Sequence, residues 1–257
     1  MSRPEVSLRV PRVTVFFWII KALSTAMGEA ASDYLVHVFP PVVAVLLGFV
    51  VFVVAMVLQF TRRRYVAWAY WLAVCAVGVF GTMVADVLHV GFGVPYAVSA
   101  PLFAVILIAV FVVWHRTEHT VSIHTIDTTR REVFYWLAVV STFALGTAVG
   151  DLTAVTFGLG YLVSAVVFGV LILVIALAFR FAHLGAVIAF WAAYVLTRPF
   201  GASVADWFGK PPSLGGVGVG DGTVALIFLT AIVLLVAYLQ ITGRDVQASK
   251  SRHSTGS

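Results

Sequence analysis

The chain has 257 residues, of which 61% are hydrophobic and only 11% are charged. Soluble domains carry about a quarter charged residues, so this composition excludes a soluble protein and indicates a chain whose outer surface faces lipid. The net charge of +5 does not point to nucleic acid, because the basic residues lie between apolar runs and form no basic patch.

Eight runs of predominantly apolar residues are long enough to cross a bilayer as helices, which takes about 20 residues. In chain order they comprise residues 13–35, 41–60, 66–89, 96–114, 133–154, 158–179, 184–207 and 223–242. The sequence therefore predicts an all-α membrane protein with about eight transmembrane helices in a single domain. Residues 243–257 are polar and rich in serine, and we expect them to form a disordered cytoplasmic tail.

Basic residues gather in alternate loops. The N-terminal segment, the loops after the second, fourth and sixth predicted helices, and the C-terminal tail hold 13 of the 16 lysine and arginine residues, whereas the other loops hold only Lys210. Because cytoplasmic loops carry the excess of basic residues, we expect both termini in the cytoplasm. Lys21 and Arg198 fall inside predicted helices, and we expect Lys21 to extend back to the cytoplasmic interface.

A repeated motif begins in each odd-numbered predicted helix. An aromatic residue precedes a tryptophan, a glycine follows the tryptophan by ten residues, and an aspartate follows it by fifteen. The tryptophans are Trp18, Trp71, Trp136 and Trp191, the glycines Gly28, Gly81, Gly146 and Gly201, and the aspartates Asp33, Asp86, Asp151 and Asp206. This periodicity predicts four two-helix repeats, at approximately residues 10–61, 65–115, 131–181 and 184–242.

The spacing of tryptophan, glycine and aspartate resembles a family of bacterial multi-pass membrane proteins built from four tandem copies of a two-helix domain of unknown function. The resemblance extends over nearly the whole chain, from Val10 to Ile241. It implies the same four-repeat fold and a location in the bacterial inner membrane, and it implies no activity.

The motif places a polar stripe on each odd-numbered helix. At 100° per residue, the tryptophan shares a face with the residues 11 and 15 positions later. Position 11 holds Glu29, Thr82, Thr147 and Ala202, one turn before each aspartate. Small residues beside this stripe allow close helix packing, so we expect the odd-numbered helices inside and the even-numbered helices outside. Because each repeat has two helices, all four are expected to insert in parallel, around a pseudo-fourfold or two-plus-two axis.

The carboxylates of the motif form the candidate site, because acids inside spans usually face a hydrated cavity or a partner. The predicted cation site comprises four aspartates and a fifth acid, Glu29, and the hydroxyl oxygens of Thr82 and Thr147 are further ligands. The aspartates are Asp33, Asp86, Asp151 and Asp206. Oxygen ligands suit hard cations such as Mg²⁺, Ca²⁺ or Mn²⁺. Our leading interpretation is a transporter or channel-like permease for a small cation, divalent cations included.

Two alternatives stay open. In one, the acids carry protons in a proton-coupled exporter of a small molecule. In the other, the chain is a non-transporting structural or sensory membrane protein, and the aspartates hold the repeats together. An enzyme is not expected, since no catalytic motif is present, and the sequence predicts no catalytic residue, no cofactor and no nucleic-acid partner. The expected partners are the lipid bilayer and a small cation or protons.

Two further predictions concern single side chains. Arg198 of the fourth repeat is expected to pair with Glu29 or Asp33 of the first, across the seam that closes the array. His37 and His89 follow their aspartates closely, but the other two repeats lack a histidine there. We therefore expect these histidines to make interfacial hydrogen bonds and not to bind metal.

Overall fold

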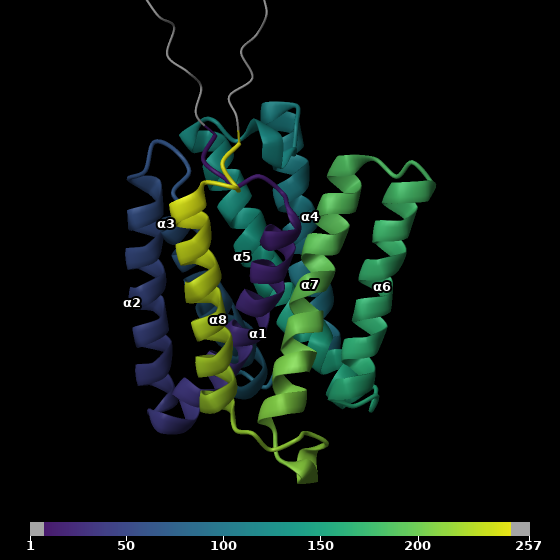
Figure 1. The fold of residues 1–257 in the computed structure, drawn as a ribbon. Helices are drawn as coiled ribbons and strands as arrows, with labels where there is room; N and C mark the ends of the chain where they lie inside the picture. Colours follow the sequence, from purple (N-terminus) through teal and green to yellow (C-terminus); the bar gives the residue numbers. More distant parts are fainter. Residues whose placement is uncertain (1–7, 248–257) are drawn as a thin grey trace, which may run out of the picture.

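The computed structural model describes residues 8–247, and these form eight long α-helices and four short helical turns, with no strand among them. The long helices are α1 (Val15–Val38), α2 (Pro41–Phe60), α3 (Ala67–Asp86), α4 (Tyr96–Glu118), α5 (Thr129–Asp151), α6 (Tyr161–Phe181), α7 (Ala186–Gly209) and α8 (Asp221–Thr242) (Figure 1). The predicted all-α class with eight helices is confirmed.

Local signals set the helix ends. The side chains of Thr14 and Thr128 cap α1 and α5 by accepting hydrogen bonds from backbone N–H groups three residues on. Pro41 opens α2 at a position where its missing N–H has no helical partner. Gly243 ends α8 in the left-handed conformation, with φ of 63°, which glycine adopts without steric cost.

Seven of the eight long helices are long and apolar enough to cross a membrane. Their combined apolar surface indicates a membrane protein. The exception among the described helices is α1, because Lys21 and Glu29 lower the hydropathy of its most apolar stretch. Of the eight predicted transmembrane helices, seven are therefore supported by length and apolar composition.

The helices form two layers. Between 61% and 67% of the most apolar stretch of α3, α5 and α7 is buried inside the protein, whereas the corresponding share of α2, α4, α6 and α8 is between 17% and 28%. Helix α1 also belongs to the inner layer, since eleven of its 24 residues are buried. The predicted inner layer of odd-numbered helices is confirmed. The exposed leucine, valine and phenylalanine side chains of the outer helices suit contact with lipid.

The four inner helices pack in a closed ring, in the order α1, α3, α5, α7 and back to α1. Each motif glycine lies against the residue three positions before the next motif glycine. The pairs are Gly28 with Gly78, Gly81 with Phe143, Gly146 with Arg198, and Gly201 with Thr25. The absence of a side chain at each motif glycine therefore sets the spacing of the ring at all four joints.

Each outer helix packs mainly on the inner helix of the following repeat. Helix α2 lies on α3, α4 on α5, and α6 on α7, while α8 returns to α1 and closes the circle. Figure 1 shows the consequence, with α2 and α6 at opposite flanks and α1 and α7 between them. A single repeat therefore buries most of its helix surface against its neighbours and not against itself.

The two ends of the described chain meet at one end of the bundle. The backbone N–H of Arg12 donates to the carbonyl of Asp245 at 2.7 Å, and the guanidinium of Arg9 bonds the buried carboxylate of Glu132 at 2.7 Å. Of the predicted disordered tail, residues 243–247 belong to the described structure and Asp245 is buried. Residues 248–257 lie outside the described part of the chain.

Replacing Gly28 with alanine should destabilise the bundle. The new methyl group would lie 2.7 Å from the backbone carbonyl carbon of Gly78, and neither backbone can move aside without separating α1 from α3. We expect a loss of about 1–3 kcal/mol, seen as a lower midpoint of thermal unfolding in detergent. The matched control is Gly169→Ala on α6, where the methyl would meet the Phe200 ring at 3.4 Å. Equal midpoints for the two variants would contradict the packing role of Gly28.

Candidate functional site

Five positions of the repeat define layers of side chains along the inner helices. The aromatic layer, one residue before each tryptophan, contains Phe17, Tyr70, Tyr135 and Phe190. Three, seven and eleven residues after the tryptophan come the lysine layer (Lys21, Val74, Val139, Tyr194), the arginine layer (Thr25, Gly78, Phe143, Arg198) and the threonine layer (Glu29, Thr82, Thr147, Ala202). The aspartate layer (Asp33, Asp86, Asp151, Asp206) lies fifteen residues after it.

The aromatic layer closes one end of the ring. Each of its rings packs against the tryptophan of the next repeat, with centroid distances between 5.6 and 6.1 Å. The pairs are Phe17 with Trp71, Tyr70 with Trp136, Tyr135 with Trp191, and Phe190 with Trp18. The one hydrogen bond from a motif indole among the described residues runs from Trp191 to the carbonyl of Val121, at 2.8 Å. The tryptophans therefore brace the repeats at the end opposite the aspartates.

Lys21 is buried at the centre of the bundle, so the prediction that it extends to the interface is wrong. Its side chain is completely inaccessible, and its Nζ lies 4.0 Å from the centroid of the Phe143 ring and 4.1 Å from that of Tyr194. Among the described residues its ammonium has no hydrogen-bond partner. Closure of the ring causes this, because α5 and α7 cover the face of α1 that carries Lys21.

Arg198 joins all four inner helices. Its Nη2, carried by α7, bonds the Glu29 carboxylate of α1 at 2.5 Å, the Thr147 hydroxyl of α5 at 2.7 Å, and the Thr82 hydroxyl of α3. Of the two partners predicted for Arg198 across the seam, Glu29 and Asp33, the structure confirms Glu29. Since Arg198 and Glu29 are both buried, each satisfies a charge that would otherwise be costly.

The carboxylates of the aspartate layer lie near the ammonium of one lysine, Lys210. One carboxylate oxygen each from Glu29, Asp33 and Asp206 lie within 4.8 Å of one another. The ammonium of Lys210, just after α7, lies 2.5 Å from Asp33 and 3.8 Å from Asp206. It also lies 3.9 Å from Asp221, at the start of α8. The structure thus brings the acids of the first and fourth repeats together.

The aspartates of the second and third repeats have a different setting. Asp86 and Asp151 are the last residues of α3 and α5, and each precedes a π-helical turn, η1 (Val87–Gly91) or η3 (Leu152–Thr156). Neither forms an ion pair within the described part of the chain, and both are partly exposed. Both are close enough to Glu29 to interact with it electrostatically, and the Tyr96 hydroxyl lies beside Asp151. These two carboxylates therefore carry no ion pair in the described structure, and a neutral hydroxyl accompanies one of them.

Lys210, Asp221 and Tyr96 are site residues that the motif did not reveal. Lys210 carried a signal, because it is the single basic residue in the loops that otherwise lack basic residues. Asp221 and Tyr96 belong to outer helices, and only packing brings them to the aspartate layer. Burial by itself would lower the pKa of Lys210, but Asp33, Asp206 and Asp221 outweigh it and raise the pKa above its ordinary value. The ammonium thus keeps its charge at neutral pH.

The two histidines near the aspartates bond backbone groups, as predicted. His37 Nδ1 lies 2.9 Å from the carbonyl oxygen of Asp33, and His89 Nδ1 lies 3.0 Å from that of Val94. Neither belongs to the group of potential ligands formed by Glu29, Asp33 and Asp206. The candidate site therefore offers oxygen ligands.

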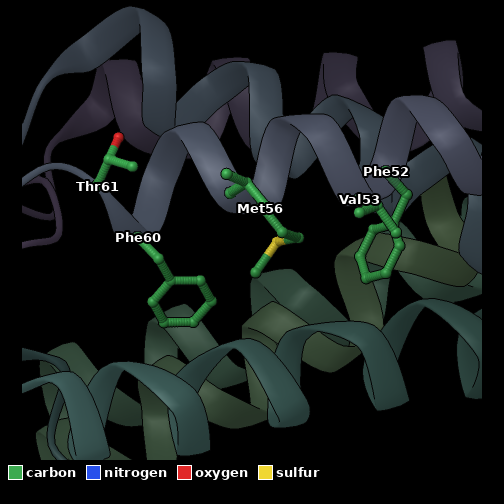
Figure 2. Close-up of a pocket in the computed structure, with 6 residues that line it drawn as sticks. Phe52, Val53, Met56, Phe60 and Thr61 are labelled. Carbon is green, nitrogen blue, oxygen red and sulfur yellow. The ribbon is translucent and has the colours of Figure 1, made fainter.

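A groove on the outside of the bundle has different chemistry. It is lined by Phe52, Val53, Met56, Val57, Phe60 and Thr61, all on α2 or at its end. Figure 2 shows the side chains of Phe52, Met56 and Phe60 extending from one face of α2. Because the lining is almost entirely apolar, the groove suits lipid chains and not a charged solute.

One family model matches the chain, and it matches four times in tandem. The family is described as Repeat of Unknown Function (DUF347), and the matches cover residues 16–65, 69–120, 134–183 and 189–245. The chain belongs to this family. The predicted resemblance to a family built from four tandem repeats of unknown function is thereby confirmed. No curated protein and no solved structure matches the chain. Membership in the family establishes the repeat architecture, and function rests on the residues.

Removing the charge of Arg198 alone should destabilise the bundle more than removing the charges of Arg198 and Glu29 together. Arg198→Gln leaves the Glu29 carboxylate buried without its cation, and breaking such a pair costs about 3–5 kcal/mol. We expect little folded protein from Arg198→Gln and substantial recovery in Arg198→Gln/Glu29→Gln, measured as monodisperse protein in detergent.

The matched control for this pair is Arg130→Gln, which breaks an ion pair with Glu118 at a position where the arginine side chain is 62% exposed. It should change stability by less than about 1 kcal/mol. If the double variant is no better folded than Arg198→Gln, the two charges are not coupled in the way the geometry indicates.

Proposed function

We propose that the chain is a membrane transporter for a small cation and that the aspartate layer, with Glu29, is its binding site. The observation that carries the proposal is the convergence of Glu29, Asp33 and Asp206, whose oxygens lie within 4.8 Å of one another. Asp86 and Asp151 add two carboxylates without an ion pair in the described structure. Intramembrane acids are costly to keep and mark ion pathways in membrane proteins.

The inner layers favour a carrier over an open channel. Lys21 and Arg198 are completely buried on the path from the aspartate layer to the aromatic layer, and both are basic. Fixed positive charges in a pore exclude cations. Toward the aromatic layer, the buried rings of Tyr70, Tyr135 and Tyr194 fill the space between the inner helices. A cation bound at the aspartate layer therefore crosses through a change in the packing of the repeats.

The proposal includes an arrangement in the membrane. All four repeats insert in parallel, α1 serves as the eighth span, and both termini lie in the cytoplasm of a bacterial cell whose inner membrane holds the protein. The bias of basic residues supports this orientation, since the end where Arg9, Arg12 and Arg131 lie is the basic one. The aspartate layer would then face the outside.

Hard cations fit the chemistry of the site. Every potential ligand at the aspartate layer is a carboxylate or hydroxyl oxygen, which favours Mg²⁺, Ca²⁺ or Mn²⁺ over softer metals. The site carries several acids against the single ammonium of Lys210, which leaves negative charge for a divalent ion. A carboxylate cluster of this kind also binds protons, so proton-coupled transport uses the same residues.

The alternative that the acids hold the repeats together is supported at the threonine layer, which contains Glu29. Arg198 satisfies Glu29, Thr82 and Thr147 within the closed ring, so these contacts hold the four repeats together. Asp86 and Asp151 form no ion pair among the described residues, and the polar group beside Asp151 is the neutral hydroxyl of Tyr96, so their charge is left for a cation. The proposal therefore divides the acids between Glu29, which also braces the ring, and the aspartates, which bind the cation.

Neutralising Asp151 should abolish cation uptake and leave the protein folded. In Asp151→Asn the side chain keeps its shape and loses its negative charge, so a divalent ion loses one anionic ligand while the ring contacts stay intact. Uptake of Mg²⁺, Ca²⁺ and Mn²⁺ into reconstituted vesicles should fall at least tenfold. The matched control is Asp127→Asn, at the opposite end of the bundle beside Arg131. If Asp151→Asn unfolds in detergent or transports normally, the binding role is wrong.

Removing the ammonium of Lys210 should strengthen cation binding. It lies within 3.9 Å of three carboxylates, so an incoming cation has to displace it. Without cation, Lys210→Gln should unfold at a lower temperature than the wild type, because the acids then repel one another. On addition of a divalent cation its midpoint should rise at about tenfold lower concentration, equivalent to ~1.4 kcal/mol.

Arg180→Gln, on an outer helix, is the control for this prediction. A cation affinity unchanged by Lys210→Gln would show that the cation does not bind where the ammonium lies.

A further inference from the structure

The apolar groove on α2 ends at three consecutive arginines. Its lining extends along the helix to Thr61, and Arg62, Arg63 and Arg64 follow directly. Arg63 and Arg64 are exposed, and Arg62 is partly exposed. None of the three forms an ion pair with an acid in the described part of the chain. An apolar surface is therefore continuous with three positive charges that the described residues do not neutralise.

The groove matches one leaflet of a bilayer in depth. Phe52, Met56 and Phe60 are spaced four residues apart, so their side chains form a stripe along one face of α2 (Figure 2). At 1.5 Å per residue the stripe is about 12 Å long. The hydrocarbon core of one leaflet is about 15 Å thick, half of the whole core. An acyl chain that lies along the stripe therefore extends from the arginines nearly to the middle of the bilayer.

One side of the groove is fixed by packing, and the other side is open. The ring of Phe52 stacks on Phe80 of α3, with 5.1 Å between centroids, and Met56 is partly buried against the hydrophobic core. Val53 and Val57, in contrast, are 39% and 56% exposed. A flexible hydrocarbon chain can enter such a groove from the lipid side, because no described side chain has to leave it.

The arginines lie where lipid headgroups are expected. The guanidinium of Arg62 lies 5.0 Å from the centroid of the Trp68 ring, which is exposed near the start of α3. Exposed tryptophans are enriched at the membrane–water interface. The Nε of Arg62 is buried and has no hydrogen-bond partner among the described residues. Guanidinium groups bind phosphate oxygens through paired hydrogen bonds, so this corner of the bundle suits a phosphate headgroup.

We propose that the groove and the three arginines form a binding site for an anionic phospholipid of the surrounding bilayer. One acyl chain lies along Phe52, Met56 and Phe60, and the headgroup phosphate binds the guanidinium groups that follow α2. A zwitterionic lipid has the same chains, but its own positive charge is repelled by the arginines. The site is separate from the aspartate layer and goes beyond the proposed cation transport.

A lipid bound here stabilises a joint between two repeats. Helix α2 belongs to the first repeat and packs mainly on α3 of the second. The lipid chain covers the apolar surface that α2 leaves open beside this joint, and the headgroup neutralises charges that otherwise repel one another. Because a ligand that binds the folded state raises its stability, the anionic lipid should raise the unfolding midpoint.

The test compares phosphatidylglycerol with phosphatidylcholine of identical acyl chains. Each lipid is titrated into full-length protein in a non-ionic detergent, bound lipid is counted by native mass spectrometry, and the unfolding midpoint is followed in the same samples. The wild type should bind one phosphatidylglycerol about tenfold or more tightly than phosphatidylcholine. Its midpoint should rise with phosphatidylglycerol at concentrations where phosphatidylcholine has no effect.

Removing the three arginine charges should remove the preference for the anionic lipid. The variant is Arg62→Gln/Arg63→Gln/Arg64→Gln, and its binding of phosphatidylcholine should stay as in the wild type. The matched control removes three charges elsewhere, at the ends of the other outer helices, in Arg116→Gln/Arg180→Gln/Arg244→Gln. This control has the same net charge and should keep the wild-type preference. If the first variant does not fold, Arg63→Gln/Arg64→Gln changes only exposed side chains and should also lower the preference.

The groove is tested separately from the arginines. Val57→Trp places a large ring in the groove and should weaken phosphatidylglycerol binding about tenfold, although all three arginines remain. The matched control is Val54→Trp, which lies outside the lining at nearly the same exposure, 53% against 56%. It should bind both lipids as the wild type does.

Three results would overturn the site. They are equal binding of the two lipids by the wild type, an unchanged preference in the folded arginine variants, and equal lipid binding by Val57→Trp and Val54→Trp. A dimer of the wild type that Val57→Trp dissociates would assign the groove to a second copy of the chain and overturn the site as well. None of these measurements involves cation uptake, so they decide the lipid site whether or not the aspartate layer transports a cation.

Discussion

The architecture depends on one buried guanidinium. Arg198 brings hydrogen bonds from α7 to the acid of α1 and the hydroxyls of α3 and α5, so a single side chain ties the ring of inner helices at its axis. The contact is possible because the neighbouring motif glycine, Gly146, leaves room for the arginine side chain. Without the glycine joints the helices would stand too far apart for Arg198 to reach all three partners.

The layers combine symmetry at both ends with asymmetry between them. The aromatic and aspartate layers repeat in every copy, and they brace one end of the bundle and gather negative charge at the other. The three layers between them carry their charged residues in the first and fourth repeats only, as Lys21, Glu29 and Arg198. These repeats meet at the seam where α7 and α8 close on α1. The seam is therefore where the four copies differ in charge, because a charge inside the closed ring needs a partner of opposite sign, as Arg198 has in Glu29.

The packing of each outer helix on the following repeat links the four copies into one unit. Any movement of α7 relative to α1 changes the contacts of α6 and α8 at the same time. This connectivity supports the proposed carrier, because inner and outer helices of neighbouring repeats cannot move independently of one another. The same connectivity places the termini and the aromatic layer together, at the end opposite Lys210.

Composition and periodicity were enough to predict the helices, the inner and outer layers, and the pairing of Arg198 with an acid of the first repeat, because in lipid each span must be apolar and each buried charge needs a partner. The motif also identified the acids. Only the tertiary structure decided the position of Lys21, which lies near enough to a helix end to reach water until α5 and α7 cover it. It also decided that Lys210, Asp221 and Tyr96 join the site, since these residues lie outside the repeated motif and reach the aspartates only through closure of the ring.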